Sequence, residues 1–134
     1  MHDILQPDGW APPIGYANGI AASGRTIVVG GQIGWNAAQQ FESDDLVDQV
    51  RQTLENIVAV LCEGGAAPAH LVSLTWYLTD IEDYLANARE IGRAWREVIG
   101  RHFPAMAVVE VTRLVERRAK VEIQATAVVP NTQS

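Results

Sequence analysis

The sequence predicts a single α+β domain in which two helices pack on one face of a mixed sheet. Strand-like alternation of apolar residues occurs towards both ends of the chain, and two segments with helical spacing lie between these strands. The chain has 134 residues, which is enough to bury one core without a metal or a disulfide. The expected domain covers residues 1–134, with the element order β-β-α-β-α-β-β.

The first part of the chain is expected to be an arm followed by a hairpin. Residues 1–13 contain three prolines and Gly9, which predict an irregular N-terminal arm. The segment GYANGIAASGRTIVVGG then predicts two short strands that pair around Ser23 and Gly24. The next segment, GGQIGWNAAQQF, predicts a loop, because its glycines permit close approaches that a side chain would prevent.

Two helices are predicted from capping residues and apolar spacing. The first begins after Ser43, where two aspartates suit an N-cap and a first turn, and its apolar residues recur at helical spacing. A Gly-Gly pair at 64–65 ends it. Thr79 and Glu82 resemble a capping box that opens the second helix. Three arginines of that helix, Arg89, Arg93 and Arg96, follow a spacing typical of a solvated helix face.

Three further strands are predicted at residues 70–78, 105–111 and 121–129. In the last strand Val121 and Ile123 share the apolar face, so Glu122 faces away from it. The face opposite the helices is expected to combine Glu122 with Met106 and Val108, which is too apolar for a solvated surface. A second copy of the chain is therefore expected to cover this face.

Composition and charge exclude several classes of function. A net charge of -6 and a pI near 4.9 argue against a nucleic-acid partner, which requires a basic face. No segment approaches the roughly 20 apolar residues of a membrane span, and the N-terminus lacks a basic leader, so a cytoplasmic protein is expected. The single cysteine, Cys62, excludes an internal disulfide and is expected to be buried. The three histidines lack ligand spacing, so no metal is expected.

Five segments occur in an order and at separations that resemble one protein family: GYANGI, GGQIGW, QVRQTLENIVAVLCEGGA, LVSLTWYLTDIEDY, and FPAM followed by VEIQATAV. The chain from Gly15 to Val129 thus resembles the Rid family, the YjgF-like reactive intermediate deaminases. The resemblance implies a chorismate-mutase-like fold and a homotrimer with a central barrel of sheets. It also implies small-molecule sites in the clefts between subunits and no cofactor.

The resemblance implies hydrolysis of an imine or enamine to a ketone and ammonia. This chemistry needs a cation that holds the substrate carboxylate and a carboxylate that holds and polarises the attacking water. Glu122 matches the glutamate of the family's VEIE-like motif and is therefore the expected catalytic residue. Tyr16 matches the family's pocket aromatic residue. The other residues expected to bind substrate are Gly31, Trp35, Arg89, Met106 and Val108.

The chain departs from the family pattern at the carboxylate anchor. The best-known deaminases carry an arginine where this chain has Met106, and often a cysteine where it has Val108. A sheltered arginine–carboxylate bond contributes about 1.5–3 kcal/mol, so methionine is no conservative replacement. Arg89 is a candidate replacement from the second helix, with a solvated surface role as the equal alternative; the family's pocket asparagine there aligns with Ala88 or Arg89, depending on the direction of counting. Arg113 is a weaker candidate.

The sequence leaves two main functions open. The first is an imine or enamine deaminase for a substrate bulkier or more apolar than 2-aminoacrylate, which Trp35, Trp76 and Met106 indicate. The alternative is a non-enzymatic trimer that binds a small metabolite in the cleft between subunits, for which Met106 is the main argument. A trimer that only binds other proteins is a third possibility, which Glu122 and the glycine-rich segment disfavour.

Overall fold

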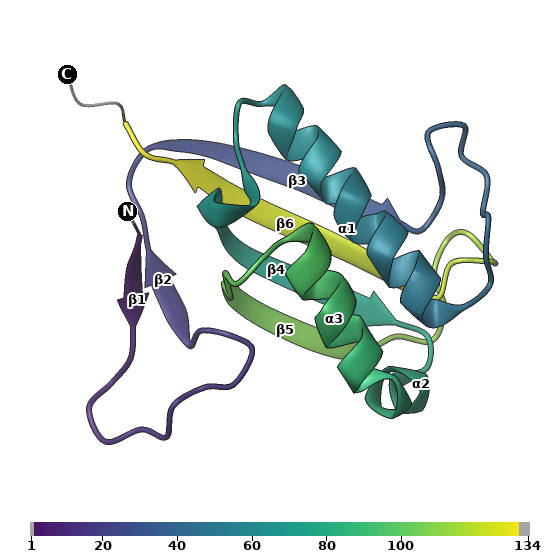
Figure 1. Ribbon diagram of the computed structural model, residues 1–134, viewed down its shortest axis with the longest axis horizontal. Helices are drawn as coiled ribbons and strands as arrows, with labels where there is room; N and C mark the ends of the chain where they lie inside the picture. Colours follow the sequence, from purple (N-terminus) through teal and green to yellow (C-terminus); the bar gives the residue numbers. More distant parts are fainter. Residues whose placement is uncertain (1, 132–134) are drawn as a thin grey trace.

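The computed structural model describes residues 2–131, in which one sheet is covered on a single face by two long helices (Figure 1). The strands are β1 (Asp3–Leu5), β2 (Gly19–Ala21), β3 (Arg25–Ile33), β4 (Leu71–Leu78), β5 (Ala105–Glu110) and β6 (Val121–Val129). The helices are α1 (Leu46–Glu63), α2 (Ile81–Ala86) and α3 (Ala88–Val98), with a 3-10 turn, η1 (Pro68–His70), before β4. The main sheet has the order β3-β6-β4-β5, in which only β4 and β5 are parallel to each other. The expected α+β architecture is confirmed.

The apolar stripe of α1 supplies most of the contact with the sheet. Four of its side chains are fully buried, at 0% exposure: Val50, Leu54, Ile57 and Leu61. Each such residue contributes about 1.5–3 kcal/mol through burial, so this stripe is what fixes α1 over β3 and β6. The helix ends at Gly64, as its Gly-Gly pair predicts. Cys62 lies on the outer side of the last turn and is exposed, so the prediction of a buried thiol was wrong.

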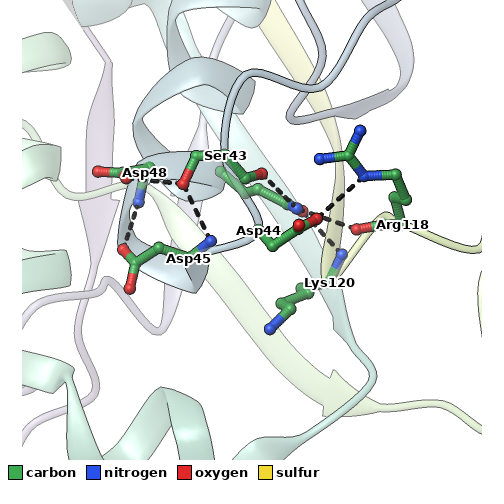
Figure 2. A network of polar contacts seen from close by, with 7 residues as sticks. Ser43, Asp44, Asp45, Asp48, Arg118 and Lys120 are labelled. Atoms are coloured by element: carbon green, nitrogen blue, oxygen red, sulfur yellow. Dashed lines mark hydrogen bonds and ion pairs between the residues drawn. The ribbon is translucent and has the colours of Figure 1, made fainter.

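Gln49 ties the start of α1 to the connection between β5 and β6. The side chain is 1% exposed, and its Nε2 donates to the carbonyl groups of Ser43 and Arg118, at 3.1 and 2.9 Å. Its Oε1 accepts from the backbone N–H of Lys120, at 2.8 Å. Figure 2 shows Ser43, Arg118 and Lys120 gathered at this point, beside an ion pair between Arg118 and Asp44. The network fixes where β6 begins, and hence which of its side chains face the helices.

The pairing of the first strands differs from the prediction. β1 lies within the expected irregular arm and pairs with β2, so the arm is partly regular. β2 does not pair with β3, which instead runs antiparallel to β6, so the predicted hairpin was wrong. The turn residue Gly24 has φ 145°, and a Cβ there would overlap the carbonyl group of Val129. Since Gly24 lies against the end of β6, the chain enters the main sheet at that point.

Two other boundaries were misplaced. The N-cap of the second helical segment is Asp80 rather than Thr79, because the Asp80 carboxylate accepts from the N–H groups of Glu82 and Asp83. This segment divides into α2 and α3 at Asn87, whose side chain donates back to Asp83. The predicted loop from Gly30 onwards begins as strand, since β3 continues to Ile33 through a bulge.

No helix in the described part of the chain has the length and apolar character needed to span a membrane.

Candidate functional site

A cavity of about 710 Å³ lies between α3, the face of β5 and the segment that precedes β2. This volume is in the range of small-molecule sites. Its lining is dominated by five aromatic side chains: Tyr16, Trp76, Tyr84, Trp95 and Phe103. The rings of Trp76 and Trp95 lie 6.2 Å apart, and Trp95 stacks on Phe103 at 6.5 Å. An aromatic or bulky apolar group would find close contacts here.

A backbone contact holds Tyr16 at the mouth of this cavity. The N–H of Ala17 donates to the carbonyl group of Pro104, at 3.1 Å, and Ala17 forms an isolated parallel bridge to Ala105. Tyr16 therefore lies beside the start of β5, with 44% of its surface exposed. The structure places Tyr16 in the cavity lining, together with Met106 and Val108.

Met106 and Val108 point towards the helices, contrary to the prediction that they share a face with Glu122. In the parallel pairing of β4 with β5, Met106 lies beside Leu74 and Val108 beside Trp76. Leu74 and Trp76 are core residues, and both β5 side chains pack against that core. Alternation alone could not reveal this, because β5 carries apolar residues on both of its faces.

Glu122 lies on the open face of the sheet, as predicted. Its neighbours Val121 and Ile123 are fully buried towards the helices, so the Glu122 side chain points the opposite way. The carboxylate rests against the backbone of Gly31, where a Cβ would overlap it. Within residues 2–131 this carboxylate has no hydrogen-bond or ion-pair partner. The bulge between Val29 and Gln32 brings Gly31 to this position.

Other predicted site residues lie outside the cavity. Trp35 follows β3, packs against Phe41 with their ring centroids 5.9 Å apart, and is not part of the cavity lining. Arg89 is exposed and also absent from the lining, whereas its neighbour Ala88 contributes to it. Arg113 lies in the connection between β5 and β6.

One cation, Arg96, borders the cavity while remaining exposed, as its helix spacing predicts. Arg96 is the one charged side chain among the described residues that line it. Burial raises the pKa of Tyr84, which keeps its hydroxyl group neutral. The described residues contain no cluster of three or more side chains able to ligate a metal ion. Arg96 lines the cavity, whereas the other arginines of its helix do not, because of how α3 packs against β5; the helix sequence alone does not specify this packing.

The predicted site is thus divided between the two faces of the sheet. The helix side has an apolar cavity with Tyr16, Met106 and one cation, which suits an organic anion with a large side chain. The open side has Gly31 and the unpaired Glu122 carboxylate, which suits a bound water molecule. A single copy of the chain does not bring these two halves together, because β4 separates β5 from β6.

Comparisons with known proteins agree with this architecture. The family described as Endoribonuclease L-PSP matches residues 9–129. A RutC family protein of Haemophilus influenzae is 36% identical over 105 residues, which cover 78% of this chain and 80% of that protein. The 2-iminobutanoate/2-iminopropanoate deaminase of Escherichia coli is 32% identical over 113 residues, 84% and 86% of the two chains. Among solved structures, the Rid-family protein YyfB of Yersinia pestis, described as of unknown function, has a TM-score of 0.84 at 30% identity and covers 96% and 98% of the two chains.

Proposed function

Because this chain belongs to the Endoribonuclease L-PSP family, which includes the RutC and Rid proteins, we propose that it hydrolyses a reactive imine or enamine to a ketone and ammonia without a cofactor. The deaminase name of its Escherichia coli relative supports this class of reaction. One structural observation carries the proposal. The carboxylate of Glu122 is half-buried, unpaired within the described residues, and packed on the bare backbone of Gly31.

The mechanism needs only that carboxylate and a water molecule. Glu122 holds the water by accepting a hydrogen bond and takes its proton as the oxygen attacks the imine carbon. The proton passes to the nitrogen of the tetrahedral intermediate. As the carbon–nitrogen bond breaks, the new hydroxyl group gives up its proton, which Glu122 takes and passes to the departing ammonia. The products are a ketone and ammonia, and Glu122 returns to its ionised form. A protonated imine carbon is already electrophilic, so no metal or covalent nucleophile is required.

The complete site is proposed to form between copies of the chain in a homotrimer. The open face of the sheet carries exposed apolar side chains, among them Val28 at 75% and Val109 at 41% exposure, which a second copy would cover. Glu122 lies on that same face. In a head-to-tail ring, Glu122 of one copy can meet the cavity of the next, so that the two halves of the site combine.

The cavity favours a substrate bulkier than 2-aminoacrylate. Its aromatic lining would leave a three-carbon substrate poorly packed, whereas an aromatic side chain fills a volume of this kind. Met106 adds apolar surface where the best-known family members carry an arginine.

A non-enzymatic trimer that binds a metabolite in the same cleft is the second candidate. The observation that favours it is Met106, which removes the family's carboxylate anchor from β5. Ligand-dependent thermal stabilisation without turnover would indicate this function.

Binding of nucleic acid is not part of the proposal, although the family description names an endoribonuclease. The net charge is -6, and the cavity lining offers one cation among the described residues. Tight binding of a phosphate backbone draws on several such groups.

The test is to generate imines in situ with an amino-acid oxidase and to measure the release of ammonia by the wild type and by Glu122→Gln. The variant should fold and assemble normally, because Gln keeps the size of the side chain, but its turnover should be lost. Glu55→Gln, at an exposed position of α1, is the matched control and should behave as wild type. Wild-type ammonia release by Glu122→Gln would refute the mechanism.

A further inference from the structure

The side chain of Arg96 extends along α3 towards Gly92, where the helix carries no side chain. Gly92 precedes it by one turn, and an ideal Cβ at Gly92 would lie 3.5 Å from Nη1 of Arg96. Side chains on a helix lean towards its N-terminus, so Arg96 covers the surface that Gly92 leaves bare. Both residues line the aromatic cavity. The Arg96 side chain is exposed, but its Nη1 lies beside Gly92, so the guanidinium group borders the cavity.

This guanidinium group has no acidic partner in the described part of the chain. The ion pairs within residues 2–131 are Arg51–Glu97 and Arg118–Asp44. Glu97, the acidic residue next to Arg96 in sequence, is thus engaged by an arginine of α1. A cation beside an apolar cavity, without a carboxylate of the same chain, can bind the carboxylate of a ligand.

A second donor in the cavity lining is also unpaired. Trp76 is 3% exposed, and its indole N–H has no hydrogen-bond partner among the described residues. Buried donors are nearly always satisfied, and an unpaired one calls for a partner that the chain itself does not supply. An acceptor on a ligand bound in the cavity would satisfy it.

We infer that Arg96 binds the substrate carboxylate and that the aromatic cluster around Trp95 receives an aromatic side chain. The substrate class is then a 2-imino acid with an aromatic side chain, such as the imine of phenylalanine. The anchor has moved from β5, where Met106 now stands, to α3 on the other side of the cavity. This inference rests on the proposed function for the reaction, but the binding role of Arg96 can be tested without turnover.

The test uses phenylpyruvate, the keto acid product of this class, and phenylacetone, its analogue without the carboxylate. Affinities are measured by titration calorimetry on the wild type, Arg96→Gln and Arg93→Gln. Arg93 is exposed on the same helix and is not part of the cavity lining, so its variant is the matched control. Arg96→Gln should weaken phenylpyruvate binding about 10- to 100-fold, the loss expected for one charge-assisted bond, and leave phenylacetone binding unchanged. Arg93→Gln should match the wild type for both ligands.

Three results would overturn the inference. The first is that Arg96→Gln binds phenylpyruvate as tightly as the wild type does. The second is that the wild type does not measurably bind phenylpyruvate, and the third is that the wild type binds both ligands with equal affinity. Thermal unfolding of each variant shows that a loss of affinity is not a loss of fold. The hydrolase proposal alone would fail if the wild type released no ammonia from any imine but still bound phenylpyruvate in a manner that depends on Arg96.

Discussion

Replacement of Gly31 by alanine should lower turnover about 100-fold and leave the fold intact. The added Cβ would overlap the Glu122 carboxylate and would lie 2.9 Å from Cδ and 3.1 Å from Cγ of that residue. Gly31 does not have a positive φ, so alanine is allowed there by the backbone. Glu122 is half-buried and can rotate away, so the variant should lose less than about 1 kcal/mol of unfolding free energy. A displacement of the carboxylate by about 1 Å is enough to lower turnover about 100-fold.

Two neighbouring glycines provide matched controls for this effect. An alanine Cβ at Gly30 would meet nothing within 4 Å, so Gly30→Ala should change neither turnover nor stability. A Cβ at Gly34 would lie 2.7 Å from Cα and 2.8 Å from the carbonyl oxygen of Gln49. Because this is helix backbone and cannot rotate aside, Gly34→Ala should lower the unfolding free energy by about 1–3 kcal/mol.

The three variants are compared by urea unfolding and by ammonia release from imines generated in situ. The expected pattern is that Gly34→Ala loses stability, Gly31→Ala loses turnover, and Gly30→Ala loses neither. If Gly31→Ala retained wild-type turnover, the position of the Glu122 carboxylate would not matter, and the reasoning that assigns it the attacking water would be refuted.

Four further variants test the fold and its pH dependence. Gln49→Ala leaves Lys120 N–H and two carbonyl groups unpaired, and should lower the unfolding free energy in urea by about 3 kcal/mol or more. Leu54→Ala should cost about 2–5 kcal/mol because the side chain is fully buried, whereas Val60→Ala, at a position 39% exposed, should cost less than about 1 kcal/mol in the same assay. Burial raises the pKa of Tyr84 above 10.0, so the phenol loses its proton more readily in the unfolded chain; stability should fall as the pH rises past that value, and Tyr84→Phe should reduce this fall in thermal unfolding at alkaline pH.

Sequence patterns were most reliable where one local period determines the result. The apolar spacing of α1 predicted its buried stripe, and the alternation in β6 predicted that Glu122 would face away from the helices. In both cases the pattern and the burial arise from the same geometry, 3.6 residues per turn or two residues per repeat. The resemblance to the Rid family added the proposed catalytic role of Glu122, which alternation alone leaves as one polar position in a strand.

The errors lie where partners distant in sequence decide the outcome. The predicted hairpin assumed that neighbouring strands pair, but β3 pairs with β6, about a hundred residues further along the chain. The face of Met106 depends on the parallel register of β5 with β4, which neither strand encodes by itself. Arg96 is exposed, as its helix spacing predicts, but it also lines the cavity, which depends on how α3 packs against the sheet.

The central claim is that the site is completed by two copies of the chain, one of which supplies Glu122 and the other the cavity. It is tested most directly by mixing two inactive variants. Glu122→Gln lacks the carboxylate, and Gly92→Phe fills the cavity from α3, so each should be inactive alone.

When the two variants are refolded together in equal amounts, a random mixture of head-to-tail trimers has an intact carboxylate facing an intact cavity at about one quarter of its sites. Since about a quarter of the sites are intact, we predict that ammonia release by the mixture returns to about a quarter of the wild-type rate. A mixture no more active than its two parents would contradict a site shared between copies.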